Sequence, residues 1–251
     1  THFENSMGGG ETWRNMNSSS SPCHRASASS ERACRGIWDK KMVERVDWGS
    51  RAREGFLASG IDPADRRGHK NRYIDLLQKM ALEEVLDLKG NEIVLDFGCG
   101  SGRMTYWIAP KVKKVIGLET TPEMIELAKE NRKSENVEFV VYDGIHLPLF
   151  PYSFDLILSI GVLQYMERDA LKNAVSELAK NLENGGKLYL IEQASDNLKI
   201  NRPTTEDYLR TFKALHLRCC QHYAIRNGRW WLLDLIQYGL IPQKWFPRLA
   251  L

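Results

Sequence analysis

Short apolar runs alternate with amphipathic stretches between residues 91 and 192. The short runs are typical of buried parallel strands, and they lie at Ile93–Phe97, Lys114–Leu118, Val137–Tyr142, Phe154–Ile160 and Lys187–Glu192. Helical patterns separate them, at Arg103–Pro110, Pro122–Arg132 and Ala170–Leu182. This alternation predicts an α/β fold with a doubly wound, mostly parallel sheet and helices on both faces, with ligands at the carboxyl ends of the strands.

The chain before residue 91 has a different pattern. Residues 1–35 are dominated by Ser, Gly, Asn and Arg and show no apolar period, so we expect a disordered leader. From residue 36 to residue 90 the apolar side chains recur at helical spacing, which predicts a helical N-terminal extension that caps the domain. The period is clearest from Tyr73 to Leu86, and Gly90 is expected to close this helix as its C-cap residue.

The C-terminal part continues the predicted domain, which we place at residues 91–251. Its patterns predict a helix at Thr204–Leu215, a strand at Leu217–Arg226 and an amphipathic helix at Trp230–Tyr238.

Charge and cysteine content narrow the classes of function. The net charge of +3 divides into +2 over residues 1–90, −4 over 91–192 and +5 over 193–251. So small a surplus, with no recognisable RNA-binding module, predicts no nucleic-acid partner. Five cysteines without a CxxC pair argue against a disulfide framework and against a metal site, and they favour a cytoplasmic location. No apolar run approaches the ~20 residues that a transmembrane helix needs.

The strongest chemical signal follows the first predicted strand and reads VLDFGCGSGR over residues 94–103. Gly98, Gly100 and Gly102 allow a sharp turn and a close approach to a ligand, and the helix after them offers free N–H groups. A dinucleotide-binding loop requires GxGxxG, with glycine where Arg103 stands, whereas this pattern is DxGxGxG. The acid, Asp96, favours a ligand that carries positive charge over a pyrophosphate.

This segment and the strands after it, over about residues 91–195, resemble the class I S-adenosylmethionine (SAM)-dependent methyltransferases. SAM carries an ammonium and a sulfonium group, which suits an acid at the end of the strand. The resemblance implies a Rossmann-like methyltransferase fold, with SAM as the cofactor and S-adenosylhomocysteine as the product.

The resemblance also implies roles for the residues that follow the next strands. Glu119, followed by Thr120, stands where the family holds both ribose hydroxyls, and a carboxylate there can accept two charge-assisted hydrogen bonds. Asp143, followed by Gly144, matches the acid that accepts the adenine amino group. Ser159 ends the segment that resembles the family's loop into its fourth strand.

Three further candidates for the cofactor site can instead be residues of the hydrophobic core. Cys99 reads as a small packed side chain and not as a nucleophile, because SAM chemistry needs no thiolate. Met124 can flank the adenine or belong to the core. Tyr73 can cover the methionine end of the cofactor or be a core aromatic on its helix. No catalytic residue is assigned, because the candidate histidines cannot be ranked as bases.

The C-terminal part departs from the family. Members finish with a seventh strand that lies antiparallel beside the sixth, but no apolar run corresponds to it here, so we expect it to be missing through truncation or shortening. The same region has a cluster of aromatic and basic residues that can make a peripheral membrane contact or form an aromatic face packed on the sheet. The cluster comprises Arg226, Arg229, Trp230, Trp231, Lys244, Trp245, Phe246 and Arg248.

These patterns predict an enzyme that transfers the methyl group of SAM by direct displacement to a small-molecule, sugar or lipid-precursor acceptor. The Asn/Asp-Pro-Pro-Tyr/Phe motif is absent at Leu158–Gly161, which disfavours DNA-adenine and release-factor substrates. Two alternatives stay open: a non-catalytic SAM-binding or scaffold protein of the same fold, and an NAD-dependent oxidoreductase, which the glycine spacing disfavours. The sequence does not identify the acceptor or the oligomeric state.

Overall fold

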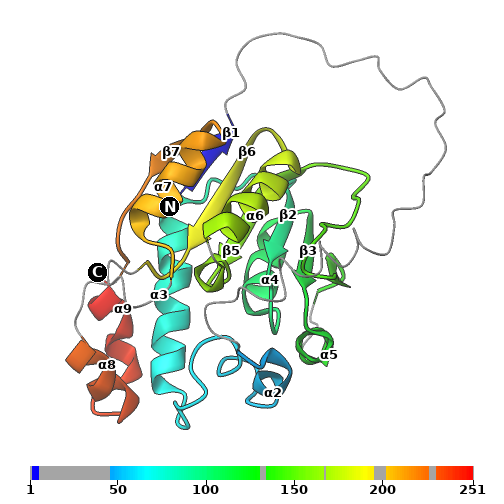
Figure 1. The fold of residues 1–251 in the computed structure, drawn as a ribbon. Helices are drawn as coiled ribbons and strands as arrows, with labels where there is room; N and C mark the ends of the chain where they lie inside the picture. The colour runs from blue at the N-terminus through cyan, green and yellow to red at the C-terminus, as the bar shows by residue number, and fades with distance from the viewer. Residues whose placement is uncertain are drawn as a thin grey trace, which may run out of the picture.

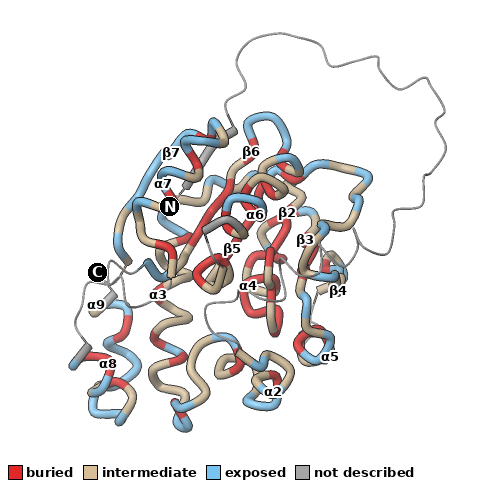
Figure 2. Tube along the Cα trace, in the orientation of Figure 1, coloured by how far each residue is buried: buried red, intermediate tan, exposed pale blue. Residues whose placement is uncertain are grey.

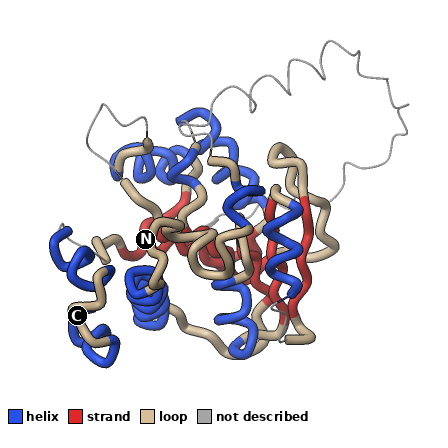
Figure 3. Tube along the Cα trace, turned by 90° about the horizontal axis from the view of Figure 1, so that it is seen from below, coloured by secondary structure: helices blue, strands red, loops and turns tan. Residues whose placement is uncertain are grey.

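The computed structural model describes residues 2–5, 46–130, 134–166, 168–194, 202–225 and 230–250. Most of the predicted leader and the first part of the predicted cap, residues 6–45, lie outside these ranges. In the described part, helices cover both faces of a central sheet (Figures 1 and 3). The predicted α/β fold with a doubly wound sheet is therefore confirmed.

The sheet has the strand order β4-β3-β2-β5-β6-β1-β7. All neighbours from β4 to β6 are parallel. Their bounds are Ile93–Phe97 for β2, Lys114–Glu119 for β3, Val137–Val141 for β4, Phe154–Ile160 for β5 and Leu182–Ile191 for β6. Each of the five strands predicted between residues 91 and 192 is present. Among them only β6 differs markedly, because it begins five residues before the predicted Lys187 and contains a register shift against β5. The strand predicted at Leu217–Arg226 is present but ends at Gln221.

Strand β1 (His2–Asn5) lies between β6 and β7 (Leu217–Gln221) and runs antiparallel to both. Residues 2–5 of the predicted disordered leader form a strand, which corrects that prediction for these residues. The described residues after β7 contain no strand, as expected, and the position next to β7 where the seventh strand was expected is filled by β1 from the other end of the chain. The sequence HFEN contains a single apolar residue, so its pairing depends on backbone hydrogen bonds that an apolar pattern does not reveal.

The helices follow the predicted order with small changes at their ends. Pro122 starts the helix after β3, as its fixed φ angle favours. A complete capping box, formed by Thr204 and Asp207, begins the helix before β7. The helices are α2 (Trp48–Ala52), α3 (His69–Val85), α4 (Arg103–Ile108), α5 (Pro122–Glu130), α6 (Arg168–Lys180), α7 (Thr205–Ala214), α8 (Trp230–Gln237) and α9 (Phe246–Ala250).

Side chains of the central strands alternate between two apolar layers, because successive residues of a strand point to opposite faces. Leu95 and Ile157 pack in the layer that α6 and α7 cover. Val94 and Leu156 pack in the layer that α4 and the end of α3 cover. The buried residues of the core thus follow the strands through the middle of the molecule (Figure 2). This packing fixes the carboxyl ends of the strands, where the glycine loop begins.

Helix α3 ends earlier than the sequence predicts. Its last residue is Val85, and the C-cap is the extended Leu86 and not Gly90. Leu86 and Leu88 are partly buried against the apolar layer beside α4, and the chain leaves the helix early to reach it. Gly90 has a φ of 86° and instead forms a turn, in which its N–H donates to the Glu92 carboxylate at 2.9 Å.

A separate apolar cluster joins α3 to the C-terminal helices. Leu232 and Ile236 of α8 and Phe246 of α9 pack against Tyr73 and Leu77 of α3. The predicted alternative of an aromatic face packed on the sheet is therefore wrong. No helix in the described ranges is long and apolar enough to cross a membrane.

Candidate cofactor site

The glycine loop leaves β2 through a turn that only glycine can make without strain. The N–H groups of Gly98 and Cys99 both donate to the Leu118 carbonyl of β3, at 2.7 and 3.0 Å. Gly98 has a φ of 67°, and a Cβ atom there would lie 2.4 Å from a methyl carbon of Val162. Gly102 caps α4 with a φ of 78°, and its Cβ would lie 2.9 Å from the Phe139 ring. The loop is thus packed tightly at both ends.

The middle glycine of the loop has an open side. Gly100 has a φ of 53°, and no atom lies within 4 Å of the position that its Cβ would take. Its N–H donates to Oε2 of Glu119 at 3.1 Å. The predicted glycine and the predicted ribose acid are therefore in direct contact, beside space that a ligand can enter.

Glu119 ends β3 and also organises the start of α5. Its Oε1 accepts hydrogen bonds from the N–H groups of Thr120 and Thr121, at 2.7 and 3.0 Å, and from the Thr120 hydroxyl at 3.1 Å. Oε2 accepts only the Gly100 N–H among the described contacts. Since a carboxylate oxygen can accept two hydrogen bonds, Oε2 has capacity for a ligand hydroxyl, whereas Oε1 would have to release a local donor.

Asp143 lies in an exposed turn after β4. Its Oδ1 accepts from the N–H groups of Ile145 and His146, each at 2.8 Å. These backbone bonds, that of His146 first, lower the pKa of Asp143 to about 2. A Cβ on Gly144 would lie 3.2 Å from the Thr120 methyl group, so the turn meets the residue that follows Glu119. The second and third predicted loops are thereby brought together.

Asp96 lies below the loop and is buried. Its Oδ2 accepts a hydrogen bond of 2.6 Å from the Thr105 hydroxyl on α4. Burial raises the pKa of Asp96 to about 6. Burial likewise raises the pKa of the Cys99 thiol well above its usual value, so the thiol stays protonated. Cys99 is 8% exposed, in agreement with its prediction as a small packed side chain.

Ser159 contacts Glu192, an acid that the sequence patterns did not indicate as part of the site. The buried Ser159 hydroxyl donates to Oε1 of Glu192 at 2.9 Å. The same carboxylate accepts the N–H groups of Val162 and Gln164, at 3.2 and 3.1 Å, and so holds the turn that follows β5. Burial raises the pKa of Glu192 to about 7. A polar residue directly after a buried strand was the only sequence signal for it.

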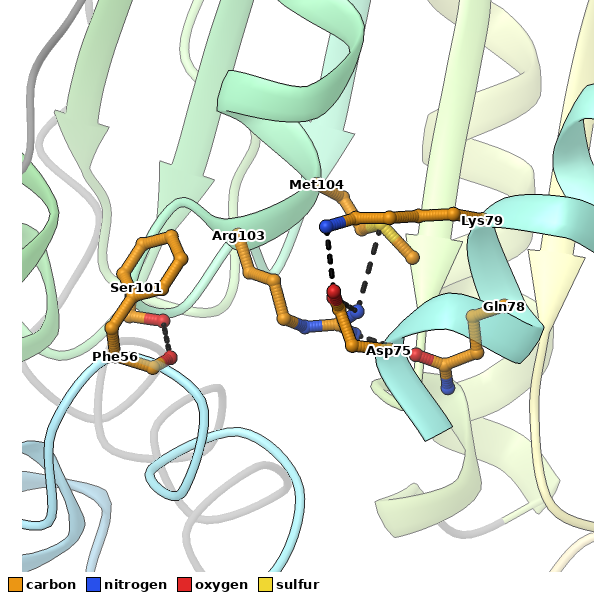
Figure 4. Close-up of polar contacts among 7 residues, drawn as sticks. All are labelled: Phe56, Asp75, Gln78, Lys79, Ser101, Arg103 and Met104. Atoms are coloured by element: carbon orange, nitrogen blue, oxygen red, sulfur yellow. Dashed lines mark hydrogen bonds and ion pairs between the residues drawn. The ribbon is translucent and has the colours of Figure 1, made fainter. Parts of the chain in front are cut away.

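Two residues of the loop itself anchor the N-terminal cap (Figure 4). The Ser101 hydroxyl donates to the Phe56 carbonyl at 2.6 Å. The buried Arg103 guanidinium donates to the carboxylate of Asp75 at 2.7 Å and to the side-chain oxygen of Gln78 at 2.8 Å, both on α3. The glycine motif therefore positions the N-terminal cap as well as its own turn after β2.

The aromatic residue that reaches this end of the sheet is not Tyr73. The Tyr73 ring packs on Phe246 at 5.3 Å between centroids, and its hydroxyl donates to the Leu249 carbonyl at 3.2 Å. The alternative of a core aromatic is correct. Instead, Trp48 of α2 packs edge to face on Tyr165 after β5, with 5.4 Å between centroids.

Met124, the last predicted contact residue, lies inside α5 with 1% of its surface exposed. Its side chain therefore belongs to the core, which was the predicted alternative, and is not open to a ligand in this structure. No group of three or more His, Cys, Asp or Glu side chains in the described ranges could hold a metal ion.

Residues 94–186, which include this loop and the acids after it, match a protein family described as methyltransferase domain. Over these residues the chain is a class I SAM-dependent methyltransferase domain. Its topology from β4 to β6 is parallel, as the resemblance implied.

Curated relatives of the methyltransferase domain include two proteins that are named for different acceptors. "Methyltransferase GfsG" of Streptomyces halstedii is 31% identical over 53% of this chain and 47% of its own length. Demethylmenaquinone methyltransferase of Lactococcus lactis is 32% identical over 54% of this chain and 55% of its own. The 18S rRNA (guanine-N(7))-methyltransferase bud23 of Schizosaccharomyces pombe is 32% identical over 33% and 31%. The chain thus spans about half the length of the first two.

Solved structures share the fold of the methyltransferase domain. A chain in the complex between the Haloferax volcanii Trm112 methyltransferase activator and its methyltransferase aligns with a TM-score of 0.56 at 19% identity. The alignment covers 78% of this chain and 94% of that one.

Proposed function

We propose that this protein transfers the methyl group of SAM by direct displacement to a small-molecule, sugar or lipid-precursor acceptor. The observation that carries the proposal is the hydrogen bond from Gly100 N–H to Glu119, at the open side of the glycine loop. It places an acid with a free acceptor position next to a backbone segment that a ligand can approach.

The residues around this opening fit the chemical groups of SAM. Oε2 of Glu119 can accept a ribose hydroxyl, and Asp143, across from Thr120, lies within the same group of loops for the adenine amino group. Asp96 provides negative charge below the loop for the cationic end. When bound, SAM supplies a methyl group on a sulfonium that a nucleophile can attack directly.

The protein's part in this reaction is mainly to position the two reactants. Holding them in line can contribute about 7–11 kcal/mol to lowering the barrier. Trp48 and Tyr165, which meet beside the end of β5, are suited to cover the site and exclude water. A base is needed only if the acceptor must lose a proton.

A small acceptor is favoured over RNA by the charge of the residues around the site. Residues 91–192 carry a net charge of −4, which would repel a phosphate backbone near the site. The relative named for demethylmenaquinone covers more of this chain than the relative named for 18S rRNA.

The test of this function replaces the predicted ribose acid. Glu119→Gln keeps the shape of the side chain but removes its charge and one acceptor oxygen. Because hydrogen bonds to charged groups contribute ~1.5–3 kcal/mol, affinity for S-adenosylhomocysteine should fall about tenfold to a hundredfold, as measured by isothermal titration calorimetry. Glu126→Gln, which changes an exposed acid on α5, is the matched control and should keep the wild-type affinity.

Binding and catalysis are separated by a second measurement on the wild-type protein. Transfer of a radiolabelled methyl group from SAM to a small-molecule extract tests the enzyme, and NAD titration tests the dehydrogenase alternative. Unchanged affinity in Glu119→Gln would remove the ribose assignment. Binding of S-adenosylhomocysteine without transfer to any extract would favour the non-catalytic alternative.

A further inference from the structure

Exposed apolar side chains are concentrated in the C-terminal helices. Four of the seven large hydrophobic side chains that are exposed in the described ranges lie between residues 231 and 245. They are Trp231 at 62%, Tyr238 at 67%, Leu240 at 68% and Trp245 at 51% exposure. Single exposed apolar residues are common on protein surfaces, whereas several that are exposed within a short segment indicate a contact surface.

Helix packing explains why these side chains point outward. Helix α8 buries Leu232, Leu233 and Ile236 against α3, and among the described residues its opposite face is exposed. Trp231 and Tyr238 are seven residues apart, and the Tyr238 N–H continues the helical pattern by donating to the Asp234 carbonyl at 3.0 Å. The two rings therefore share the outward face of α8.

Basic residues from a distant part of the chain border the same surface. The Arg67 guanidinium donates to the Tyr238 carbonyl at 3.0 Å. His69, at the start of α3, lies 3.2 Å from the Gln243 amide. Arg66 is exposed beside Arg67 in the segment that leads into α3. The turn after α8 is thus held against a basic segment that precedes it by about 170 residues in sequence.

Exposed basic residues also lie on the C-terminal side of this turn. Lys244 directly precedes Trp245, and Arg248 follows it by three residues, one helical turn further along. Asp234 is an exposed acid on the outward face of α8, between the two aromatic residues. Basic groups outnumber it at the border of the apolar patch.

We propose that this aromatic–basic surface, formed by Trp231, Tyr238, Leu240, Trp245, Lys244 and Arg248, docks on the anionic surface of a phospholipid bilayer. Trp and Tyr rings with an apolar body and a polar edge are favoured at the depth of lipid headgroups. Arg and Lys beside them are attracted to anionic lipids. Phosphate-rich headgroups match both features, whereas an apolar protein groove would match only the rings.

The surface is placed so that docking does not cover the sheet. Helix α8 lies beside α3 and away from the strands, towards the end of the molecule where α2 lies (Figure 1). The described helices offer no membrane span, so the contact would be peripheral. The proposal does not depend on the acceptor of the methyl group.

Vesicle binding of the full chain tests the proposal. Cosedimentation is measured with vesicles of phosphatidylcholine alone and with vesicles that also contain phosphatidylglycerol, at low and high salt. We expect binding to the anionic vesicles, weakening with salt, and a blue shift of tryptophan fluorescence. Since each basic residue near the surface contributes ~1 kcal/mol, Lys244→Gln with Arg248→Gln should lower the partition coefficient about twentyfold to thirtyfold.

The apolar part is tested by Trp231→Gln with Trp245→Gln, which should lower binding about tenfold or more and abolish the blue shift. Leu149→Gln with Lys172→Gln removes an exposed apolar and an exposed basic residue elsewhere, and should bind like the wild type. Equal binding of all variants would overturn the proposal. So would a concentration-dependent dimer that Trp245→Gln dissociates while vesicle binding is absent, because the occupant would then be a second copy of the chain.

Discussion

At Gly98 and Gly100 the same left-handed backbone conformation meets different surroundings. A Cβ on Gly98 would lie 2.4 Å from Val162, whereas one on Gly100 would have no neighbour within 4 Å. A glycine motif read from sequence cannot distinguish these two reasons for glycine. The structure separates a residue that the fold requires from one that leaves room for a ligand.

This difference predicts that two alanine substitutions affect stability and ligand binding differently. Gly98→Ala should lower the free energy of unfolding by about 2–4 kcal/mol, through overpacking against Val162 added to backbone strain. Gly100→Ala should cost only ~1–2 kcal/mol in stability but should weaken binding of S-adenosylhomocysteine, because its methyl group enters the open side of the loop. Urea unfolding and calorimetry measure the two quantities.

Gly185→Ala is the matched control for these variants. Gly185 also has a positive φ, of 82°, and no atom lies within 4 Å of its Cβ position, but it belongs to β6. The Gly185→Ala variant should lose as much stability as Gly100→Ala but should keep the wild-type affinity for S-adenosylhomocysteine. If Gly100→Ala bound as tightly as Gly185→Ala, the open side of the loop would not be the ligand site.

At the scale of single elements, the turn after β5 depends on one carboxylate. Glu192 accepts hydrogen bonds from Ser159 and from the N–H groups of Val162 and Gln164. Its pKa is raised to about 7 by burial, whereas in an unfolded chain a glutamate has a pKa of about 4.3. Between these values the folded protein binds a proton that the unfolded protein does not, so stability falls as pH rises.

The free energy of unfolding should therefore decrease by about 1.4 kcal/mol between about pH 6 and pH 8, for a single group that titrates near the middle of this window. Asp96 acts in the same direction but mainly below this window, because its pKa is raised only to about 6. Glu192→Gln should remove most of the decrease, whereas Glu183→Gln, on the exposed start of β6, should retain it. Urea titrations at each pH give the comparison, and an unchanged slope in Glu192→Gln would assign the titration to another group.

Strand β1 is the element that local sequence patterns could not supply. The parallel strands were predictable because each is buried on both faces and reads as an apolar run, as Val94 and Leu95 of β2 do. Residues 2–5 pair with strands about 180 and 215 positions away, as Glu4 does with Lys187 and Arg218. Local patterns could not predict the contact of Tyr73 for the same reason, because its partner Phe246 is also distant in sequence. The acids of the site could be predicted because each lies at or just after the end of an apolar strand.

Removing residues 1–5 should destabilise this edge of the sheet. Strand β7 would lose its described strand neighbour, and β6 would become an edge. With ~1 kcal/mol for each lost net hydrogen bond, the melting temperature should fall by about 5 °C or more, and hydrogen exchange should accelerate at the amides of Leu217–Gln221. Deleting residues 11–15 removes the same length of chain but no described partner of β7. If both deletions changed exchange in β7 equally, the pairing with β1 would not stabilise the protein.

At the scale of the whole molecule, the glycine loop connects the sheet to the N-terminal cap. Arg103 joins α4 to α3 through Asp75 and Gln78, and Ser101 holds the segment before α3 through the Phe56 carbonyl (Figure 4). The same segment follows α2, whose Trp48 meets Tyr165 beside β5. A ligand that orders the loop should therefore also order the cap, because the two share these contacts.

This connection predicts how cofactor binding changes the dynamics of the cap. S-adenosylhomocysteine should slow hydrogen exchange in residues 53–61, since ordering Gly100 and Ser101 also fixes the hydrogen bond to Phe56. Ser101→Ala removes that bond and should reduce the protection, whereas Ser153→Ala, in an exposed loop before β5, should not. Exchange followed by mass spectrometry, at saturating ligand for each variant, makes the comparison. Full protection in Ser101→Ala would mean that the ligand orders the cap by direct contact, or through Arg103, and not through this hydrogen bond.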